Sequence, residues 1–329
     1  MNGVNLEQFQ FEYDLTWMAF FQNEKGQTYA RYGGREDRGP ETHLTKASLI
    51  RVMRQVLDLH KNGDVQIASR FEPKPTKSVT PSDVPTMKSM MAKRKDSSCI
   101  HCHDVKVARL RHKRDLSELK KSMVFTYPTP KLFGLHVDPD IQNRVAKVET
   151  GSAADKAGIE PDDILLSSDG QRILTFGDFT RVLEFAPDGG KIDLKLKRGD
   201  AARSVSVELP TGWKQSTDPS WRPSLGVVGP GGGFWGRSSN AAERKRLGLT
   251  KDDLAIRVTF IWAPHAKATG IKLKDVVVSI DGQTNEMNMR QLHGYLQLNR
   301  KWGETVPMVV RRGDRTINMT MRLPSEPLE

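Results

Sequence analysis

Hydrophobic and polar positions follow two different periods along this chain, and the period predicts the type of element. Strands are predicted where apolar residues alternate with polar ones or form short runs, as at 145–148 and 164–166. A helix is predicted where apolar residues recur three and four positions apart, over 45–60. Another helix is expected after Thr175, its cap, with Asp178 in the first turn. The chain is therefore expected to mix helices and strands.

One pattern in the second half of the chain occurs twice, which indicates two domains of the same fold in tandem. The run from Gly151 to Gln171 recurs 112 positions later, from Ala263 to Gln283. Both copies also end alike, with an Arg-Gly-Asp turn at 198–200 and again at 312–314. The two domains are expected at residues 130–212 and 221–325.

The repeated sequence Gly-Ser-Ala-Ala-Asp-Lys-Ala-Gly-Ile, at 151–159, resembles the core motif of bacterial PDZ domains. The resemblance covers both copies and implies two PDZ domains, each a small β-barrel or sandwich with two helices. It also implies a function, because a PDZ domain binds an extended C-terminal peptide by strand addition and holds the carboxylate with loop N–H groups. The expected partners are C-terminal or extended peptide segments of other proteins.

The PDZ resemblance implies which residues form a peptide groove in each copy. Each groove would combine a loop with the apolar face of a helix: Phe133, Gly134, Leu135, Phe179 and Leu183 in the first copy, and Leu225, Gly226, Val227, Leu292 and Leu296 in the second. The alternative is that these residues fill the core and the groove is empty or closed. A segment of the chain itself could also occupy the first groove. In the second copy, the run 229–236 and a basic helix at 241–247 are inserted beside the groove, as a lid or a second contact surface.

The N-terminal third resembles a different family. Residues 15–35 read as strand, hairpin and strand, and the helix over 45–60 completes a β-β-α order. This order resembles the C-terminal half of thioredoxin-like domains in bacterial thioredoxin/PDZ proteins, some of which are selenoproteins. The resemblance implies a reactive Cys or Sec upstream of Met1. The expected fold is multidomain α+β: a partial thioredoxin-like segment at 1–70, a Pro/Lys-rich linker with a basic helix at 71–129, and two PDZ domains.

Charge and hydropathy narrow the classes of partner. The chain has 329 residues, a net charge of +11 and a mean hydropathy of −0.54. No apolar run approaches the ~20 residues of a membrane span, and the start of the chain has no signal-peptide pattern. Residues 72–122 hold 13 Lys+Arg against 6 Asp+Glu. A basic stretch can contact nucleic acid or an anionic membrane. No aromatic residues interleave with it, so a solvated face or a docking surface for a redox partner is favoured, and no nucleic acid is expected.

Both cysteines of the chain lie in the pentapeptide Cys99-Ile100-His101-Cys102-His103, which has the C-x-x-C-H pattern of c-type haem attachment. The expectation is a covalent haem c, with thioether bonds from Cys99 and Cys102 and with His103 as axial ligand. Three alternatives stay open: a dithiol–disulfide site, a zinc site, and two incidental cysteines on a solvated helix.

These features predict a PDZ peptide-binding scaffold that carries a redox group and acts in extracytoplasmic protein interaction or in electron or thiol transfer. The alternative is a thioredoxin-like thiol oxidoreductase whose catalytic residue lies upstream of Met1, and a PDZ adaptor with no redox role is a third. Bacterial PDZ domains often follow a trypsin-like protease, but the sequence has no G-x-S-G-G segment. Ser152 and His265 are assigned to PDZ structure, so the chain is not expected to be that protease. A periplasmic location is expected if the true start lies upstream.

Overall fold

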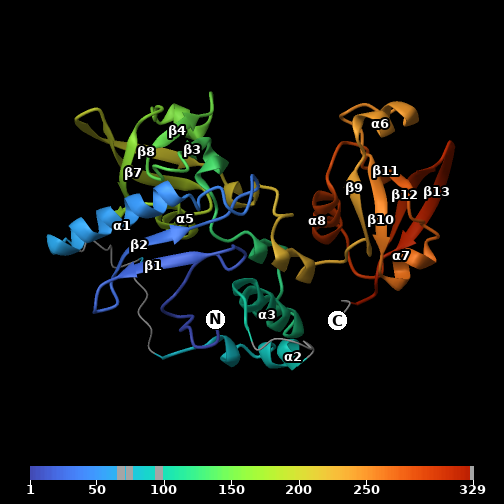
Figure 1. Ribbon diagram of the computed structural model, residues 1–329, viewed down its shortest axis with the longest axis horizontal. Helices are drawn as coiled ribbons and strands as arrows, with labels where there is room; N and C mark the ends of the chain where they lie inside the picture. The colour runs from blue at the N-terminus through green and yellow to red at the C-terminus, as the bar shows by residue number, and fades with distance from the viewer. Residues whose placement is uncertain (65–70, 72–76, 93–98, 327–329) are drawn as a thin grey trace. The chain divides into compact units, whose positions relative to one another are not determined.

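The computed structural model describes residues 1–64, 71, 77–92 and 99–326, and the chain divides into two compact units. Unit 1 comprises residues 1–116 and 122–217, and unit 2 comprises residues 117–121 and 218–329. Helices and strands are mixed in both units (Figure 1). Among the helices of the described ranges, none combines the length and the hydropathy that crossing a membrane requires.

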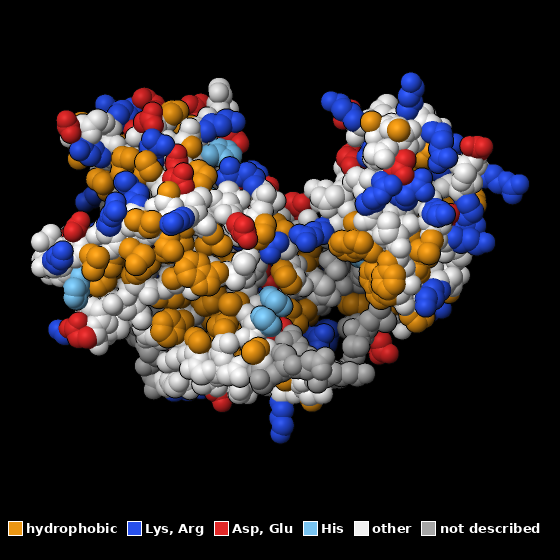
Figure 2. Space-filling model, in the orientation of Figure 1, with side chains coloured by type: hydrophobic (Ala, Val, Ile, Leu, Met, Phe, Trp, Pro, Cys, Tyr) orange, Lys and Arg blue, Asp and Glu red, His pale blue; other side chains and the backbone are white. Residues whose placement is uncertain are grey.

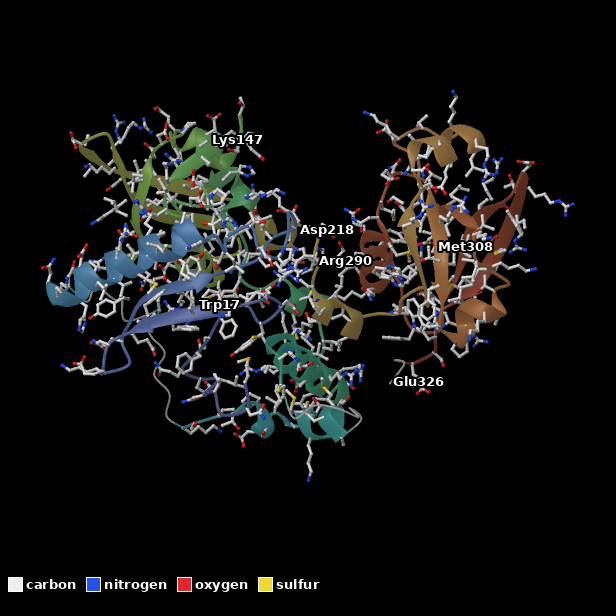
Figure 3. All side chains as sticks on the ribbon, viewed as in Figure 1. Trp17, Lys147, Asp218, Arg290, Met308 and Glu326 are labelled. Carbon is white, nitrogen blue, oxygen red and sulfur yellow. The ribbon has the colours of Figure 1, made fainter. Side chains whose placement is uncertain are left out.

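Unit 1 begins with a β-hairpin and a helix. Strands β1 (Met18–Gln22) and β2 (Thr28–Gly33) pair antiparallel, and α1 (Lys46–Lys61) packs on β2. The hydroxyl of Thr45 caps α1 by accepting the N–H of Ser48 at 3.1 Å. Trp17, labelled in Figure 3, precedes β1, and its ring meets that of Tyr32 edge-on at 5.7 Å. The strands and the helix predicted for residues 15–60 are therefore confirmed.

The thioredoxin-like identity of residues 1–70 has no support and is corrected. Within the described residues, the β1–β2 hairpin pairs with no third strand. Two strands form a poor sheet on their own and need another surface to pack against. That surface is α5 (Phe176–Phe185), which belongs to the domain that follows.

Short helical elements follow in the described segments 77–92 and 99–124. They are η1 (Pro81–Asp83), α2 (Met87–Ala92), α3 (Cys102–Asp115) and η2 (Lys121–Val124). In unit 1, residues of η1, α2, α3 and their flanks share a hydrophobic cluster with the N-terminal segment: Leu6, Phe11, Tyr13, Leu15, Val84, Met87, Ile100, Val105 and Ala108. The predicted basic helix corresponds to α3. Parts of the predicted linker, at 72–76 and 93–98, lie outside the described residues.

The first repeat, in unit 1, forms two antiparallel sheets, β3–β4 and β6–β5–β7–β8. The elements are η3 (Pro130–Phe133), β3 (Leu135–Val137), β4 (Val145–Val148), α4 (Ala153–Lys156), β5 (Ile164–Ser168), β6 (Gln171–Arg172), α5, β7 (Gly190–Arg198) and β8 (Ala201–Leu209). A short helix, η4 (Trp213–Gln215), follows β8.

The second repeat, in unit 2, forms one antiparallel sheet in the order β13–β12–β11–β10–β9, with β9 at its edge. The elements are η5 (Pro223–Val227), β9 (Phe234–Ser238), α6 (Ala241–Leu247), β10 (Ile256–Ile261), α7 (Pro264–Ala268), β11 (Val276–Ile280), α8 (Met289–Asn299), β12 (Thr305–Arg312) and β13 (Arg315–Arg322). Met308 of β12, labelled in Figure 3, belongs to its core.

An equivalent Arg–Asp ion pair stabilises each repeat internally. Arg198 lies 2.7 Å from Asp163, and Arg312 lies 2.8 Å from Asp275, both carboxylates being almost fully buried. Burial opposes the ionisation of Asp163, but hydrogen bonds from Arg198 and a backbone N–H hold its pKa below the usual range. The Arg-Gly-Asp turns therefore recur in the sequence because their arginines anchor the buried aspartate of each repeat.

Candidate peptide-binding sites

The first candidate site is the turn that leads into β3. Gly134 has φ +87°, and a Cβ there would lie 2.2 Å from the side chain of Ser152, so only glycine fits. Its carbonyl accepts the N–H of Glu149 at 2.9 Å, toward the β4 side. Because successive residues of an antiparallel strand point their N–H and C=O groups to opposite sides, those of Leu135 point to the other edge of β3. No strand of the described residues pairs with that edge, so the turn and the edge have the geometry that strand addition requires.

The apolar residues predicted for the first groove come together, but they do so in the hydrophobic core. Phe133, Leu135, Phe179 and Leu183 are all buried and belong to one cluster. Trp213, from η4, joins this cluster, and its ring lies 6.2 Å from that of Phe133, edge-on. The four residues therefore fill the core, as the alternative interpretation of the sequence expected. Only the turn and the strand edge remain as the candidate site.

The N-terminal hairpin packs against α5 through strand β2. The carboxylate of Asp178 accepts the N–H of Arg31 at 2.8 Å, and the hydroxyl of Thr175 donates to the carbonyl of Arg31. A Cβ on Gly177 would lie 2.5 Å from that carbonyl oxygen, so β2 touches the backbone of α5. Complete burial raises the pKa of Asp178 to about 6, although the charge of Arg31 opposes the shift. The hairpin is therefore an integral part of unit 1.

A cavity of about 420 Å³ lies beside the C-terminal half of α5. Its polar groups pair with one another or with close neighbours. Lys106 Nζ lies 2.7 Å from Glu12 and 3.0 Å from Asp14, and Arg181 donates to the hydroxyl of Tyr127 at 3.1 Å. We assign this network to the stability of unit 1, because buried charges persist only when they are paired. Sequence reasoning missed it, since Lys106 and Glu12 are 94 positions apart.

In unit 2, the turn before the edge strand is formed by other residues than those predicted for the second groove. Gly233 has φ +72° and directly precedes β9, and its carbonyl accepts the N–H groups of Trp262 and Ala263, which follow β10. Gly134 has the same relation to β3 and to the end of β4. Gly232 to Phe234 is therefore the equivalent turn, and a glycine directly before an alternating strand was the signal that could have identified it.

The residues predicted for that loop lie elsewhere. Leu225, Gly226 and Val227 belong to η5, which packs against α8. A Cβ on Gly294 of α8 would lie 3.3 Å from Leu225 Cδ2. Leu292 and Leu296, also predicted for the groove, are fully buried in the core of unit 2 with Phe234. As in the first copy, the predicted apolar helix residues serve the core.

His293 connects α8 to the equivalent turn. Its Nδ1 accepts the N–H of Gly232 at 3.2 Å, and its Nε2 donates to the carbonyl of Phe234 at 2.9 Å. The rings of Trp235 and Trp262 are both stacked with the imidazole, with centroids 5.9 and 6.0 Å away. Burial lowers the pKa of His293, the hydrogen bond to the Phe234 carbonyl opposes this shift, and the neighbouring His265 lowers the pKa further. The sequence analysis did not single out His293.

Trp235 and Trp262 also contribute to an exposed aromatic surface on unit 2. These two side chains and Phe260 are 42%, 41% and 59% exposed. The rings of Phe260 and Trp262 are stacked at 6.1 Å. Figure 2 shows hydrophobic side chains on the viewed face of this unit among many Lys and Arg side chains.

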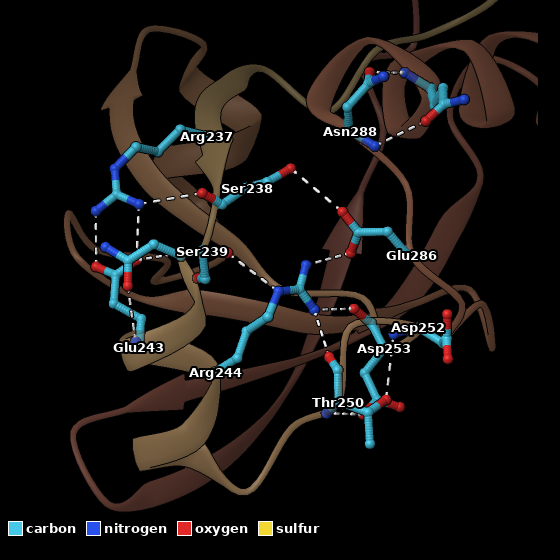
Figure 4. Close-up of polar contacts among 12 residues, drawn as sticks. Arg237, Ser238, Ser239, Glu243, Arg244, Thr250, Asp252, Asp253, Glu286 and Asn288 are labelled. Atoms are coloured by element: carbon cyan, nitrogen blue, oxygen red, sulfur yellow. Dashed lines mark hydrogen bonds and ion pairs between the residues drawn. The ribbon is translucent and has the colours of Figure 1, made fainter.

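The inserted helix α6 is fixed to its own unit (Figure 4). Arg244 donates to the carbonyls of Thr250 at 2.9 Å, Asp253 at 2.6 Å and Ser239 at 3.1 Å. It also forms an ion pair with Glu286. Four anchoring contacts to one guanidinium favour a rigid support over the lid that the sequence suggested.

The pentapeptide with both cysteines lies at the start of α3. Cys99 is exposed, whereas Cys102 is half-buried against the cluster of Leu6 and Phe11. Burial raises the pKa of the Cys102 thiol, which is opposite to the shift that activates a redox thiolate. His103 lies 3.6 Å from Asp104. Across the described ranges, no three His, Cys, Asp or Glu side chains are arranged to hold a metal ion.

Comparison with known proteins gives a PDZ domain match at residues 144–198. The chain is 26% identical over 178 residues to a probable periplasmic serine endoprotease, DegP-like, of Hahella chejuensis, with 52% of this chain and 36% of that protein covered. The chain thus spans about a third of the length of that curated relative.

Similar solved structures include the HtrA-type protease AlgW with a decapeptide, at 16% identity and a TM-score of 0.28, covering 51% of this chain and 56% of that chain. The same protease with a tripeptide has 17% identity and a TM-score of 0.28, covering 51% and 55%. An aminopeptidase N family protein from Idiomarina loihiensis has 16% identity and a TM-score of 0.20, covering 23% and 13%.

The curated relative and the PDZ match overturn the predicted redox function. The curated relative is named as a serine endoprotease, and the family match is to a PDZ domain, so both point away from a haem or thioredoxin-like redox protein. The haem- or thiol-bearing scaffold and the thioredoxin-like oxidoreductase are therefore wrong as accounts of function. The haem c and zinc assignments of Cys99, Cys102 and His103 stay predictions without a functional argument behind them. The chain contains a PDZ domain at residues 144–198, a kind of domain that binds peptides.

Proposed function

We propose that this chain is a peptide-recognition module of an HtrA/DegP-type proteolytic system that acts outside the cytoplasm. The observation that carries the proposal is the Gly134 turn at the start of the uncovered edge of β3. The PDZ match includes β4, β5, α5 and β7, which are the elements built around this turn. The similarity to a DegP-like endoprotease named as periplasmic supports the proteolytic setting and the location.

The bound peptide adds to β3 as an extra antiparallel strand. Its backbone pairs with the N–H and C=O of Leu135, which point away from β4. Its C-terminal carboxylate lies at the end of the turn and accepts the N–H of Leu135, since the N–H groups of Leu132 and Gly134 already donate to the carbonyls of Thr129 and Lys131. Thr180, which holds the position in α5 that His293 holds in α8, is buried, and its hydroxyl donates to the carbonyl of Gly177 in its own helix at 3.2 Å. Unit 1 therefore recognises exposed chain ends of unfolded or cleaved proteins.

Cleavage is assigned to a separate catalytic domain. The hydroxyl of Ser152 is committed to the start of α4, where it accepts the N–H of Asp155 at 3.2 Å. His265 Nε2 is bonded to the carbonyl of Gly231 at 3.2 Å, in unit 2. These two residues therefore serve the PDZ-like domains, and the chain supplies recognition to the system.

Fluorescence anisotropy with two labelled peptide pools tests the proposal. Each pool has ten-residue peptides randomised at the last four positions, one with a free C-terminal carboxylate and the other amidated. The full chain is expected to bind the free-carboxylate pool at least about tenfold more tightly, because charge-assisted hydrogen bonds to the turn are lost in the amide. Equal binding of both pools, or binding of neither, would contradict the proposal.

A pair of variants assigns the binding to the turn. Gly134→Ala should abolish binding, since its Cβ would lie 2.2 Å from Ser152. Gly151→Ala is the matched control, because Gly151 also has a positive φ, +76°, but a Cβ added there would meet no atom within 4 Å. Retained binding in Gly134→Ala would place the peptide somewhere other than this turn.

A further inference from the structure

The turn before β9 in unit 2 is already occupied by a side chain of the unit itself. The N–H of Gly232 is one of the donors of the turn that corresponds to the carboxylate-binding turn of unit 1. It donates to Nδ1 of His293 at 3.2 Å. Nδ1 thus takes the place that a carboxylate oxygen of a peptide would take.

The other nitrogen of the same ring occupies the edge of β9. The carbonyl of Gly233 is bonded on the β10 side, so the carbonyl of Phe234 points to the uncovered edge. It accepts a hydrogen bond from Nε2 of His293 at 2.9 Å, as it would from the N–H of an added peptide strand. One imidazole therefore satisfies both kinds of group that strand addition uses.

The glycines of the turn make room for this ring. A Cβ on Gly231 would lie 2.8 Å from His293 Nδ1, and a Cβ on Gly229 would lie 2.0 Å from the carbonyl oxygen of Gln297. The glycine-rich run thus lies directly on α8. Two indole rings, those of Trp235 and Trp262, flank the imidazole.

We propose that His293 is a gate that keeps the carboxylate-binding turn of unit 2 closed, and that unit 2 accepts a peptide C-terminus only when this imidazole is protonated or displaced. This inference rests on the proposed function, because it concerns the same class of ligand, a peptide with a free C-terminal carboxylate. It adds a second site with a different condition for binding.

Protonation opens the gate for a chemical reason. The backbone N–H of Gly232 can only donate a hydrogen bond and the carbonyl of Phe234 can only accept one. The closed state therefore needs the neutral imidazole of His293 with its proton on Nε2. A proton on Nδ1 removes the acceptor, frees the N–H of Gly232 and places a positive charge beside the turn. Acidic solution therefore favours both the opening and the binding of a carboxylate.

The surroundings of the ring set the direction of this response. His265, on α7, faces the same turn through its bond to Gly231, and its charge lowers the pKa of His293. On α8 itself, the charged or titratable residues nearest to His293 in the sequence are Arg290 and Tyr295. Figure 3 labels Arg290 at the start of the helix. The turn, β9 next to the ring and the end of β10 contribute glycines and aromatic rings. In the described part of the chain, these elements bring no carboxylate into contact with the imidazole that would favour its charged form.

Site-resolved NMR of the full chain, labelled with ¹⁵N-glycine, tests the gate. The probes are the free-carboxylate and amidated peptide pools, and the reporters are the amide signals of Gly134 and Gly232. At pH 7.5 the free-carboxylate pool should shift the Gly134 signal and leave the Gly232 signal unmoved. At pH 5 the same pool should shift the Gly232 signal, at a concentration at least tenfold below that needed at pH 7.5, and the amidated pool should not.

The variant His293→Thr should give the Gly232 response at pH 7.5 already. Wild-type protein at pH 5 keeps the test decisive if this variant does not fold. A Gly232 response in wild type at pH 7.5 equal to that at pH 5 would overturn the gate, and so would an unresponsive Gly232 at pH 5 while Gly134 responds. If neither signal responds under any condition, the proposed function fails together with the gate. A silent Gly134 with a responsive Gly232 at pH 5 would remove only the assignment to unit 1.

Discussion

Helices α5 and α8 occupy the same place in the two repeats but carry different residues at the position from which α8 reaches the turn and edge of unit 2. Both begin after a capping side chain, Thr175 or Asn288, that accepts the N–H three residues later. Five residues after the cap lie Thr180 in α5 and His293 in α8. The hydroxyl of Thr180 stays on its own helix, whereas the ring of His293 reaches the turn and β9. Of these two side chains, the hydrogen bonds of His293 alone reach a turn and an edge of the kind that strand addition uses.

The two helices also differ in what covers them. In unit 1, β2 touches the backbone of α5 at Gly177 and binds its first turn through Asp178. In unit 2, the neighbours of α8 include η5 and the glycine-rich run. The β1–β2 hairpin thus helps to bury α5 in unit 1, and the inserted glycine-rich run helps to bury α8 in unit 2. Each addition leaves the core residues of the repeat unchanged in role, as the buried pair Phe179 and Leu292 shows.

The largest effect is expected from Gly134→Ala. Left-handed backbone strain and the contact with Ser152 together should lower the free energy of unfolding of unit 1 by about 3 kcal/mol. The control Gly151→Ala has the strain without the contact and should cost about 1 kcal/mol. Urea denaturation followed through amide exchange of unit 1 measures both. Equal losses would show that the close approach to Ser152 does not matter.

The contact between β2 and α5 can be broken at a helical glycine. Gly177→Ala should destabilise unit 1 by about 1.5 kcal/mol, since the clash with the Arg31 carbonyl outweighs the better helix propensity of alanine. The control in unit 2 is Gly294→Ala, whose nearest neighbour is the Ser220 side chain at 3.0 Å, and it should be close to neutral. Thermal unfolding and amide exchange of Arg31 report the difference. If Gly177→Ala left the exchange of β2 unchanged, the hairpin would not depend on α5.

Lowering the pH should change the stability of the two units in opposite directions. Asp178 has its pKa raised to about 6, so the folded state binds its proton more readily than the unfolded state, and unit 1 gains about 1 kcal/mol between pH 7.5 and 5. His293 has its pKa lowered, so protonation favours the unfolded state, and unit 2 loses stability as the pH falls below the usual histidine value. Exchange measured at both pH values resolves the units. Asp178→Asn and His293→Thr should each remove one of the two trends, and a trend that survives its variant would need another group.

The sequence predicted the repeat and its caps well, because these depend on local patterns. Thr175 caps α5 as expected, and Asn288 caps α8 at the equivalent position of the second copy. The turn of unit 2 was misplaced because Leu225-Gly226-Val227 has the apolar–glycine–apolar pattern, whereas Gly232-Gly233-Phe234 lacks its first apolar residue. Which glycine precedes the edge strand is decided only by the pairing of β9 with β10.

The parts that could not be predicted depend on contacts between distant segments. The hydrogen bond from Arg31 to Asp178 joins residues 147 positions apart, and that from Gly232 to His293 joins residues 61 apart. A histidine on a helix does not show in sequence which backbone group it will meet. The redox function inferred from the pentapeptide was wrong for the opposite reason, since a short motif can be complete in sequence while one of its cysteines, Cys102, lies half-buried against a structural cluster.

The smallest effect is expected at that pentapeptide. Cys99 is exposed, so Cys99→Ala should change the free energy of unfolding by less than about 0.5 kcal/mol and leave the response of both turns to the peptide pools unchanged. Denaturation and peptide anisotropy provide the measurements. A loss of peptide binding would give Cys99 a role in recognition that the comparison of the two units does not include.

Reciprocal exchange of the two distinguishing residues tests the central claim most directly. The double variant Thr180→His with His293→Thr is titrated with the free-carboxylate pool at pH 7.5, and the amide signals of Gly134 and Gly232 are followed. The account predicts that the response moves from Gly134 in the wild type to Gly232 in the variant. A response that stays at Gly134, with Gly232 unmoved, would contradict it.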